Sequence, residues 1–184
     1  MALSRLFRRR TAAPAPAEAL YLALVRQARE PAFYAAHGVP DTLDGRFDMI
    51  VLHATLVLLR LKAAGASAGP LAQALFDILF ADMDRSLREM GVGDMGVGKR
   101  VKQMGKAVYG RLAAYESGLA GEDAALEAAV ARNLYGTVMP VPADVAAMGR
   151  YMRAAMAGLA RQSLGDLAAG KVAFPSPEAA RESR

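Results

Sequence analysis

An apolar segment between residues 46 and 64 constrains the fold most strongly. Wound as an α-helix, it carries Phe47, Ile50, Val51, Ala54, Val57, Leu58 and Leu61 on one side, with Met49, Leu52, Leu56 and Leu59 around it. A helix that is apolar on nearly every face is buried on all sides, whereas a surface helix has a single apolar stripe. A spanning helix needs ~20 mostly apolar residues, and this run contains His53 and Thr55 and stops at Arg60. The segment therefore predicts a central core helix that other elements surround.

The remaining sequence also follows the helical period, and no alternating strand pattern exceeds a few residues. Glycine and proline mark the boundaries between periodic segments. The helices expected are Ala17–Arg29, Asp44–Ala64, Leu71–Met90, Lys99–Ser117, Glu122–Tyr135 and Pro142–Leu167. The chain is therefore predicted to be all-α, a single compact helical domain of about six or seven helices.

Both ends of the chain differ in composition from the middle. Residues 1–16 form a basic tail with a Pro/Ala linker, and residues 172–184 are rich in Pro, Ser, Glu and Arg. Polar, proline-rich segments bury too little apolar surface to offset their ordering entropy. We therefore expect a flexible tail at 1–16, a helical domain at 17–171 and a disordered tail at 172–184.

The residue inventory argues against catalysis and against a metal or cofactor. The 184 residues include no cysteine and two histidines, which excludes thiol chemistry and disulfides and leaves little for a metal site. His53 lies in the apolar helix and is interpreted as a hydrogen-bonded core residue. Asp82 and Asp84 resemble an acid pair, but helical spacing matches Asp84 with Arg88, and Arg85 with Glu89. We expect no enzymatic activity and no bound cofactor.

The segment from Met90 to Arg100 contains a near-duplication, Met-Gly-Val-Gly-Asp followed by Met-Gly-Val-Gly-Lys. It matches a G-x-G-x-x-G fingerprint and the first seven positions of a P-loop. Arg100 stands where a P-loop needs Ser or Thr, and no buried strand precedes the glycines. Gly91–Gly98 is therefore interpreted as a turn between two helices rather than a nucleotide site.

The net charge of +5 is concentrated in two acid-free segments, residues 1–16 and 99–111. In the second, Lys99, Lys102 and Lys106 share one helix face, which we call the lysine stripe. We expect Asp94, Arg100 and the lysine stripe to form a partner-binding surface; the alternative is an ordinary solvated face. RNA is a less suitable partner, because no aromatic side chain interleaves the stripe to stack on bases.

Two further groups of residues are candidate contact sites. Methionines at helical spacing usually pack in a core, but a methionine-lined groove also accommodates varied apolar helices. The N-terminus lacks the apolar region of a secretory signal and combines apolar with basic residues, which favours weak binding to an anionic membrane. The candidates are Met148, Met152 and Met156 for a partner, and Leu3, Leu6, Phe7, Arg8, Arg9 and Arg10 for the membrane.

Three stretches resemble the ubiquinol–cytochrome c chaperone family. The first is Val39-Pro-Asp-Thr-Leu-Asp-Gly-Arg-Phe-Asp, followed by Leu52-His and the apolar helix to Leu61. The second runs from Asp82-Met-Asp-Arg-Ser-Leu-Arg-Glu-Met-Gly-Val-Gly-Asp to Val97-Gly-Lys-Arg-Val-Lys, and the third is Ala131-Arg-Asn-Leu-Tyr. The resemblance spans about residues 20–172.

The resemblance implies a bacterial helical chaperone without catalytic residues. It would bind newly made cytochrome b and support assembly of the cytochrome bc complex. Because mitochondrial members of the family associate with the inner membrane and the ribosome, the resemblance further implies contact with the ribosome. Together with the basic N-terminus, which favours an anionic membrane surface, it leads us to expect a cytoplasmic location at the inner membrane. No DNA partner is expected. The alternative function is an RNA- or ribosome-binding helical module that acts through the basic helix at 99–111.

Overall fold

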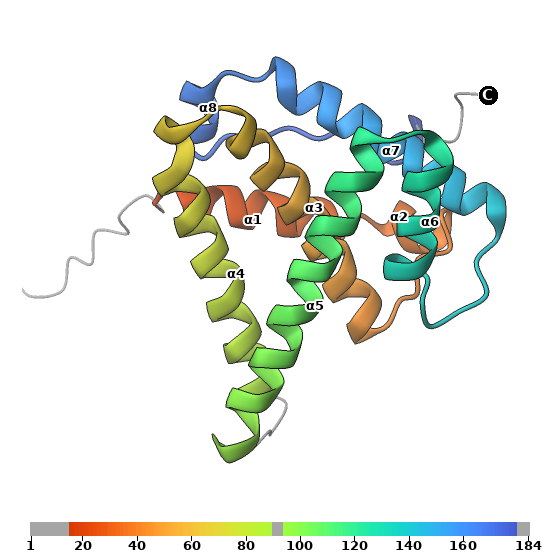
Figure 1. The fold of residues 1–184 in the computed structure, drawn as a ribbon, viewed down its shortest axis with the longest axis horizontal. Helices are drawn as coiled ribbons and strands as arrows, with labels where there is room; N and C mark the ends of the chain where they lie inside the picture. Colours follow the sequence, from red (N-terminus) through yellow and green to blue (C-terminus); the bar gives the residue numbers. More distant parts are fainter. Residues whose placement is uncertain (1–14, 90–93, 180–184) are drawn as a thin grey trace, which may run out of the picture.

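The structure, a computed structural model, describes residues 15–89 and 94–179, and within these ranges all regular structure is helical (Figure 1). The six longer helices are α1 (Pro16–Ala28), α3 (Leu43–Ala63), α4 (Gly69–Glu89), α5 (Asp94–Ala120), α6 (Asp123–Leu134) and α7 (Pro142–Arg161). Two short helices, α2 (Pro31–Ala35) and α8 (Leu164–Ala168), and a 3-10 turn, η1 (Ala66–Ala68), complete the described part. The predicted all-α class and single compact domain are confirmed.

Helix α3 is the centre of the fold, as its sequence predicts. It contacts α1, α4, α5, α6 and α7. One side of it, including Met49, Leu52 and Leu56, joins a core cluster with α6 and α7. The other side, including Val51 and Val57, joins a second cluster with α1 and α4. Two cores therefore share one helix, which explains why α3 has apolar residues all around its axis.

Two helix boundaries differ from the expectation by five residues or more. Helix α5 begins at Asp94, five residues before the predicted start at Lys99, so Gly96 and Gly98 lie within the helix. The predicted final helix ends at Arg161, because Gln162 is extended and Ser163 caps the separate helix α8 through a hydrogen bond from the Asp166 amide. The serine hydroxyl satisfies a helix-start amide, which favours starting a new helix.

Helices α4 and α5 pack against each other, and in Figure 1 their neighbouring ends, α4's C-terminus and α5's N-terminus, reach away from the rest of the molecule. Gly105 permits close packing of this pair, because a Cβ at that position would lie 3.0 Å from the Phe80 ring. This α4–α5 arm carries both the lysine stripe and one wall of the cavity described below.

The segment after α8 lies against the body, although the sequence analysis assigns residues 172–184 to a disordered tail. Val172 and Phe174 pack against both core clusters, and Pro177 is buried. Gln162 exchanges hydrogen bonds with the backbone of Ala173, and Gln27 donates to the Pro175 carbonyl. We call residues 171–178 the C-terminal strap; it extends the packed domain beyond the boundary expected at residue 171.

Candidate partner-binding site

An open cavity of about 820 Å³ lies between α1, α3, α4, α5 and α6. Its volume falls in the range of ~300–1,000 Å³ typical of ligand sites. Apolar side chains contributed by α3, α4 and α5 line it together with several arginines. We call this space the central cavity.

All three stretches that carry the family resemblance contribute to the central cavity. The first supplies Asp44, Arg46, Phe47 and Asp48; the second supplies Asp82, Met83, Ser86, Leu87 and Arg100; the third supplies Arg132 and Asn133. These stretches are far apart in sequence and belong to different helices. The fold therefore gathers the distinctive parts of the sequence around one site.

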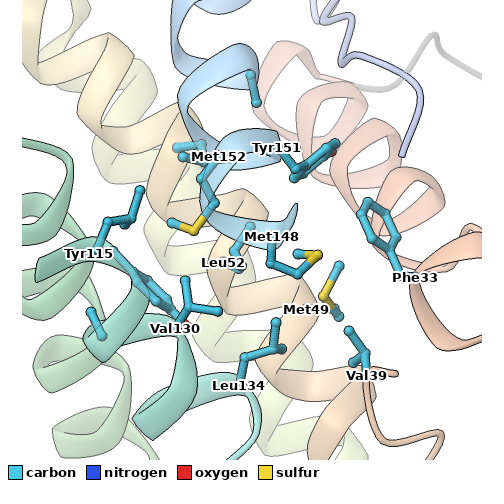
Figure 2. Close-up of a cluster of buried hydrophobic side chains, with 14 of the residues drawn as sticks. Phe33, Val39, Met49, Leu52, Tyr115, Val130, Leu134, Met148, Tyr151 and Met152 are labelled. Atoms are coloured by element: carbon cyan, nitrogen blue, oxygen red, sulfur yellow. The ribbon is translucent and has the colours of Figure 1, made fainter. Parts of the chain in front are cut away.

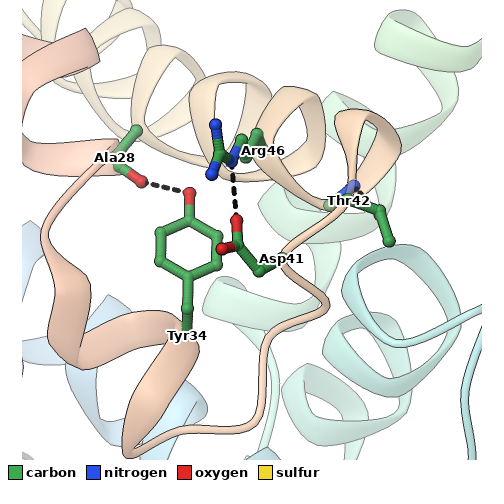
Figure 3. Close-up of polar contacts among 6 residues, drawn as sticks. Ala28, Tyr34, Asp41, Thr42 and Arg46 are labelled. Carbon is green, nitrogen blue, oxygen red and sulfur yellow. Dashed lines mark hydrogen bonds and ion pairs between the residues drawn. The ribbon is translucent and has the colours of Figure 1, made fainter.

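The first stretch is shaped by a tight turn before α3 (Figure 3). Gly38 has a φ of 63°, a conformation that glycine adopts readily, and a Cβ on Gly45 would lie 2.0 Å from the Pro40 carbonyl oxygen. Thr42 caps α3 by accepting a hydrogen bond from the Gly45 amide. Arg46 pairs with Asp41 at 2.6 Å. This turn fixes where α3 begins and so places Asp44 and Asp48 at the cavity.

The wall formed by α4 is tied to α1 through Asp82. The Tyr21 hydroxyl donates to one oxygen of this carboxylate at 2.7 Å, and Arg85 donates to the other at 2.5 Å. Burial and the Asp82 carboxylate both raise the pKa of Tyr21. The predicted Asp84–Arg88 pair is confirmed, but Arg85 pairs with Asp82 rather than with Glu89. Asp82 is therefore a structural acceptor.

A nearly buried ion pair lies at the centre of the cavity wall. Asp48 is 7% exposed, and its Oδ1 lies 2.8 Å from Nη2 of Arg111 on α5. The pair is a charge contact without hydrogen-bond geometry at Asp48 Oδ1, and within the described residues Arg111 Nε also lacks a hydrogen-bond partner. Burial raises the pKa of Asp48 to about 6, and the Arg111 charge opposes this rise. The sequence analysis missed this pair; its one available signal was an arginine in an acid-free segment.

Apolar side chains are exposed close to the cavity. Leu43, which lines it, is 63% exposed. Thr137 also lines the cavity, and the residues that follow it include Val138, 44% exposed, and Met139, 95% exposed. Large apolar side chains exposed around a cavity are compatible with an interaction surface.

The predicted partner-binding residues on α5 separate onto two faces. Lys102 and Lys106 are exposed and point away from the core, whereas Arg100 lines the central cavity. The prediction that these residues form one face is therefore wrong for Arg100. Asp94 and Lys99 lie in α5 by their backbone, and their side chains are outside the described part. Because α5 begins at Asp94, Lys99 and Arg100 do not stand at a helix start as the sequence analysis assumed.

An aromatic group borders the lysine stripe, contrary to the expectation. Tyr109 lies three residues after Lys106 and is 59% exposed. Its ring centroid is 5.3 Å from that of Phe76, which in turn lies 4.6 Å from that of Phe80. The helical period brings Tyr109 to the face of Lys102 and Lys106.

The methionine groove is not formed in this structure. Met148 and Met152 are fully buried and point into the core beside Leu52 and Val130 (Figure 2), and Met156 is partly buried against the same cluster. These side chains fill the core rather than face a partner. The predicted membrane contacts, Leu3, Leu6, Phe7, Arg8, Arg9 and Arg10, lie outside the described residues.

His53 is a satisfied core residue, as predicted. Its Nδ1 lies 2.8 Å from the Met49 carbonyl oxygen, so Nδ1 carries the proton, and Nε2 accepts a hydrogen bond from the Tyr151 hydroxyl at 2.7 Å. Burial lowers the pKa of His53 to about 4, which keeps the ring neutral. Among residues 15–89 and 94–179, no three His, Cys, Asp or Glu side chains are grouped to hold a metal ion.

None of the helices in the described part is both long enough and apolar enough to span a membrane.

Comparisons with known proteins agree on one family. The family described as ubiquinol-cytochrome C chaperone matches residues 35–174. A crystal structure of the Cbp3 homolog from Brucella abortus is similar with a TM-score of 0.80 and 37% identity, over 89% of this chain and 91% of that one.

Two curated relatives extend the agreement. Protein CBP3, mitochondrial, of Saccharomyces cerevisiae is 30% identical over 79% of this chain and 44% of its own length. Ubiquinol-cytochrome-c reductase complex assembly factor 1 of Xenopus laevis is 23% identical over 73% of this chain and 67% of its own length. The chain thus spans less than half of the yeast protein. On the match over residues 35–174, this chain belongs to the ubiquinol–cytochrome c chaperone family.

Proposed function

We propose that this chain is an assembly chaperone of the ubiquinol–cytochrome c reductase complex and that it binds newly made cytochrome b. The observation that carries the proposal is the family match over residues 35–174, together with a relative whose name is that complex's assembly factor. The chain acts by binding rather than by catalysis.

The arrangement of side chains supports a binding role. The titratable groups with shifted pKa values are engaged in structure: His53 within the core, and Asp48 with Arg111. The central cavity instead offers apolar surface and arginines, which suit a protein partner. As part of the same proposal, the chain works at the cytoplasmic face of the membrane that holds the complex, and cell fractionation tests this location.

Deletion of the gene in its host tests the function. We expect cytochrome b and the cytochrome bc complex to fall while other respiratory complexes stay near their normal amounts, and a reintroduced copy should restore them. Spectra of reduced membranes and separation of intact complexes measure this. An equal loss of all respiratory complexes would contradict a role specific to this complex.

The second candidate function is RNA or ribosome binding through the arm, which Tyr109 now favours. Exposed Lys102 and Lys106 beside an exposed aromatic ring form the combination that binds single-stranded nucleic acid. RNA binding should weaken steeply with salt through counterion release. The double variant Lys102→Glu/Lys106→Glu should melt near the parent temperature and lose both RNA binding and cytochrome b accumulation. Full activity of that variant would leave the lysine stripe an ordinary solvated face.

A further inference from the structure

We propose that the central cavity is the docking site for an amphipathic helix of a partner protein, with apolar residues against the cavity floor and carboxylates against its arginines. This inference rests on the proposed function, because the partner is a protein in the course of assembly. It adds the location of the contact and the chemistry of the segment that is held.

The floor of the central cavity is suited to an apolar helix face. Phe47 and Ile50 of α3 and Met104 of α5 line it and are partly exposed. Leu79, Met83 and Leu87 of α4 also line it, but they are at most 4% exposed and support this surface from within the core. The exposed Leu43 extends the apolar surface outward at the mouth. Partly exposed apolar side chains leading to an exposed apolar rim form the kind of surface that an amphipathic helix covers.

The charges around the cavity select for acidic residues on the occupant. Arg29, Arg100 and Arg132 line the cavity, and none of their side chains makes a hydrogen bond or ion pair with another described residue. Among the lining acids, Asp48 and Asp82 are already engaged by Arg111 and Arg85. The uncommitted charge is therefore mainly positive, and it complements carboxylates.

A buried hydrogen-bond donor in the cavity wall also favours acidic residues on the occupant. Arg111 lines the cavity, and its Nε is buried without a hydrogen-bond partner in the part of the chain that the structure describes. A buried unpaired donor costs free energy until it finds an acceptor. The guanidinium pairs with Asp48 through Nη2 and donates from Nη1 to the Ala107 carbonyl. Nε is enclosed by protein atoms, so a carboxylate oxygen of the occupant reaches it only when the Arg111 side chain shifts.

Purified full-length protein and synthetic peptides test the proposal. The probe is a fluorescent amphipathic helix with leucines on one face and glutamates on the other. Two companion peptides carry glutamine or lysine in place of glutamate. The cavity variant is Arg100→Glu/Arg132→Glu, and the matched control is Arg161→Glu/Lys171→Glu. Both variants change exposed residues and alter the net charge equally, but only the first changes the cavity.

Reversing two partly exposed charges removes attraction and adds repulsion, so the cavity variant should weaken binding of the glutamate peptide about tenfold. The control variant should stay within about twofold of the parent. Equal weakening in both variants would mean nonspecific attraction and would overturn the proposal. Equally tight binding of the glutamine or lysine peptide would overturn carboxylate recognition.

The test also separates other occupants and the wider function. If the parent protein is a dimer that only the cavity variant dissociates, a second copy fills the cavity and the proposal is wrong. Melting temperatures near the parent value show that the variants remain folded. Gene deletion tests the assembly role independently, so a negative peptide result with a positive deletion result would reject the cavity inference alone.

Discussion

At the scale of single residues, two buried groups have pKa values shifted in ways that oppose each other. The folded pKa of Asp48 is raised from 3.8 to about 6, because burial disfavours the carboxylate. The folded pKa of His53 is lowered from 6.5 to about 4, because burial disfavours the imidazolium. As pH rises from about 4 to 6.5, Asp48 ionises in the unfolded chain before it ionises in the folded protein, and this lowers the free energy of unfolding. Over the same range His53 in the unfolded chain loses its proton, so the unfolded state loses the advantage of a charged ring and the free energy of unfolding rises. Each contribution amounts to about 3 kcal/mol.

We therefore predict that Asp48→Asn changes the pH dependence of stability. Without the Asp48 ionisation, the free energy of unfolding should rise from pH 4.5 to pH 7 by about 2 kcal/mol more than in the parent protein. Leaving Arg111 without its counter-ion lowers the free energy of unfolding by a similar amount at every pH in this range. It therefore does not change how steeply the free energy of unfolding depends on pH. Urea unfolding at several pH values measures both. Parallel curves for parent and variant would show that the pKa of Asp48 is not raised by folding.

At the scale of elements, α5 contains glycines with opposite roles. Gly118 lies where α5 meets α6, and a Cβ there would be 2.9 Å from the Cα of Leu126. Gly110 lies in the same helix, and a Cβ there would meet nothing within 4 Å. The first glycine allows two backbones to approach, and the second only adds flexibility to the unfolded chain.

Alanine at these two positions should change stability in opposite directions. Gly118→Ala forces α5 and α6 apart and should destabilise the protein by about 1–3 kcal/mol, as overpacking does. Gly110→Ala should stabilise it by up to ~1 kcal/mol through helix propensity. Thermal unfolding followed by circular dichroism measures the pair. Equal effects at both positions would show that the α5–α6 contact is looser than described.

The sequence predicts elements better than it predicts their meeting points. The all-round apolar pattern correctly places α3 at the centre, since its period is local information. The Asp48–Arg111 pair and the central cavity are beyond such reasoning, because they join residues of different helices through tertiary packing. Similarly, Ser163 is recognisable as a cap only once the extended Gln162 has ended α7. Burial of Met148 and Met152 follows from which face of α7 meets α3, and periodicity alone does not settle that.

At the scale of the whole molecule, the C-terminal strap joins the two core clusters from outside. Phe174 contacts both clusters, and its ring lies 5.1 Å from that of His53. His37 lies 2.9 Å from the Pro177 carbonyl oxygen through Nε2. The strap therefore covers the place where α1, α3 and α7 meet.

Truncating the strap's aromatic side chain should affect global stability. Phe174→Ala removes a partly buried ring and should cost about 2–3 kcal/mol of unfolding free energy, toward the low end for such changes. Lys171→Ala, at an exposed position of the same segment, should stay within ~0.5 kcal/mol. Chemical denaturation compares the two. If Phe174→Ala left the free energy of unfolding unchanged, the strap would not contribute to the packed core, and the disordered tail expected from its composition would be the better description.

The strap has a consequence for the timing of synthesis. The side chains that close the junction of the two clusters follow every helix of the described part in the sequence, so the ribosome adds them after those helices have been made. A nascent chain that has emerged only as far as α8 still exposes His53 and its apolar surroundings to water. The packed state of residues 15–178 is thus reached only after residue 177 leaves the exit tunnel, so the order of translation delays the closing of this core.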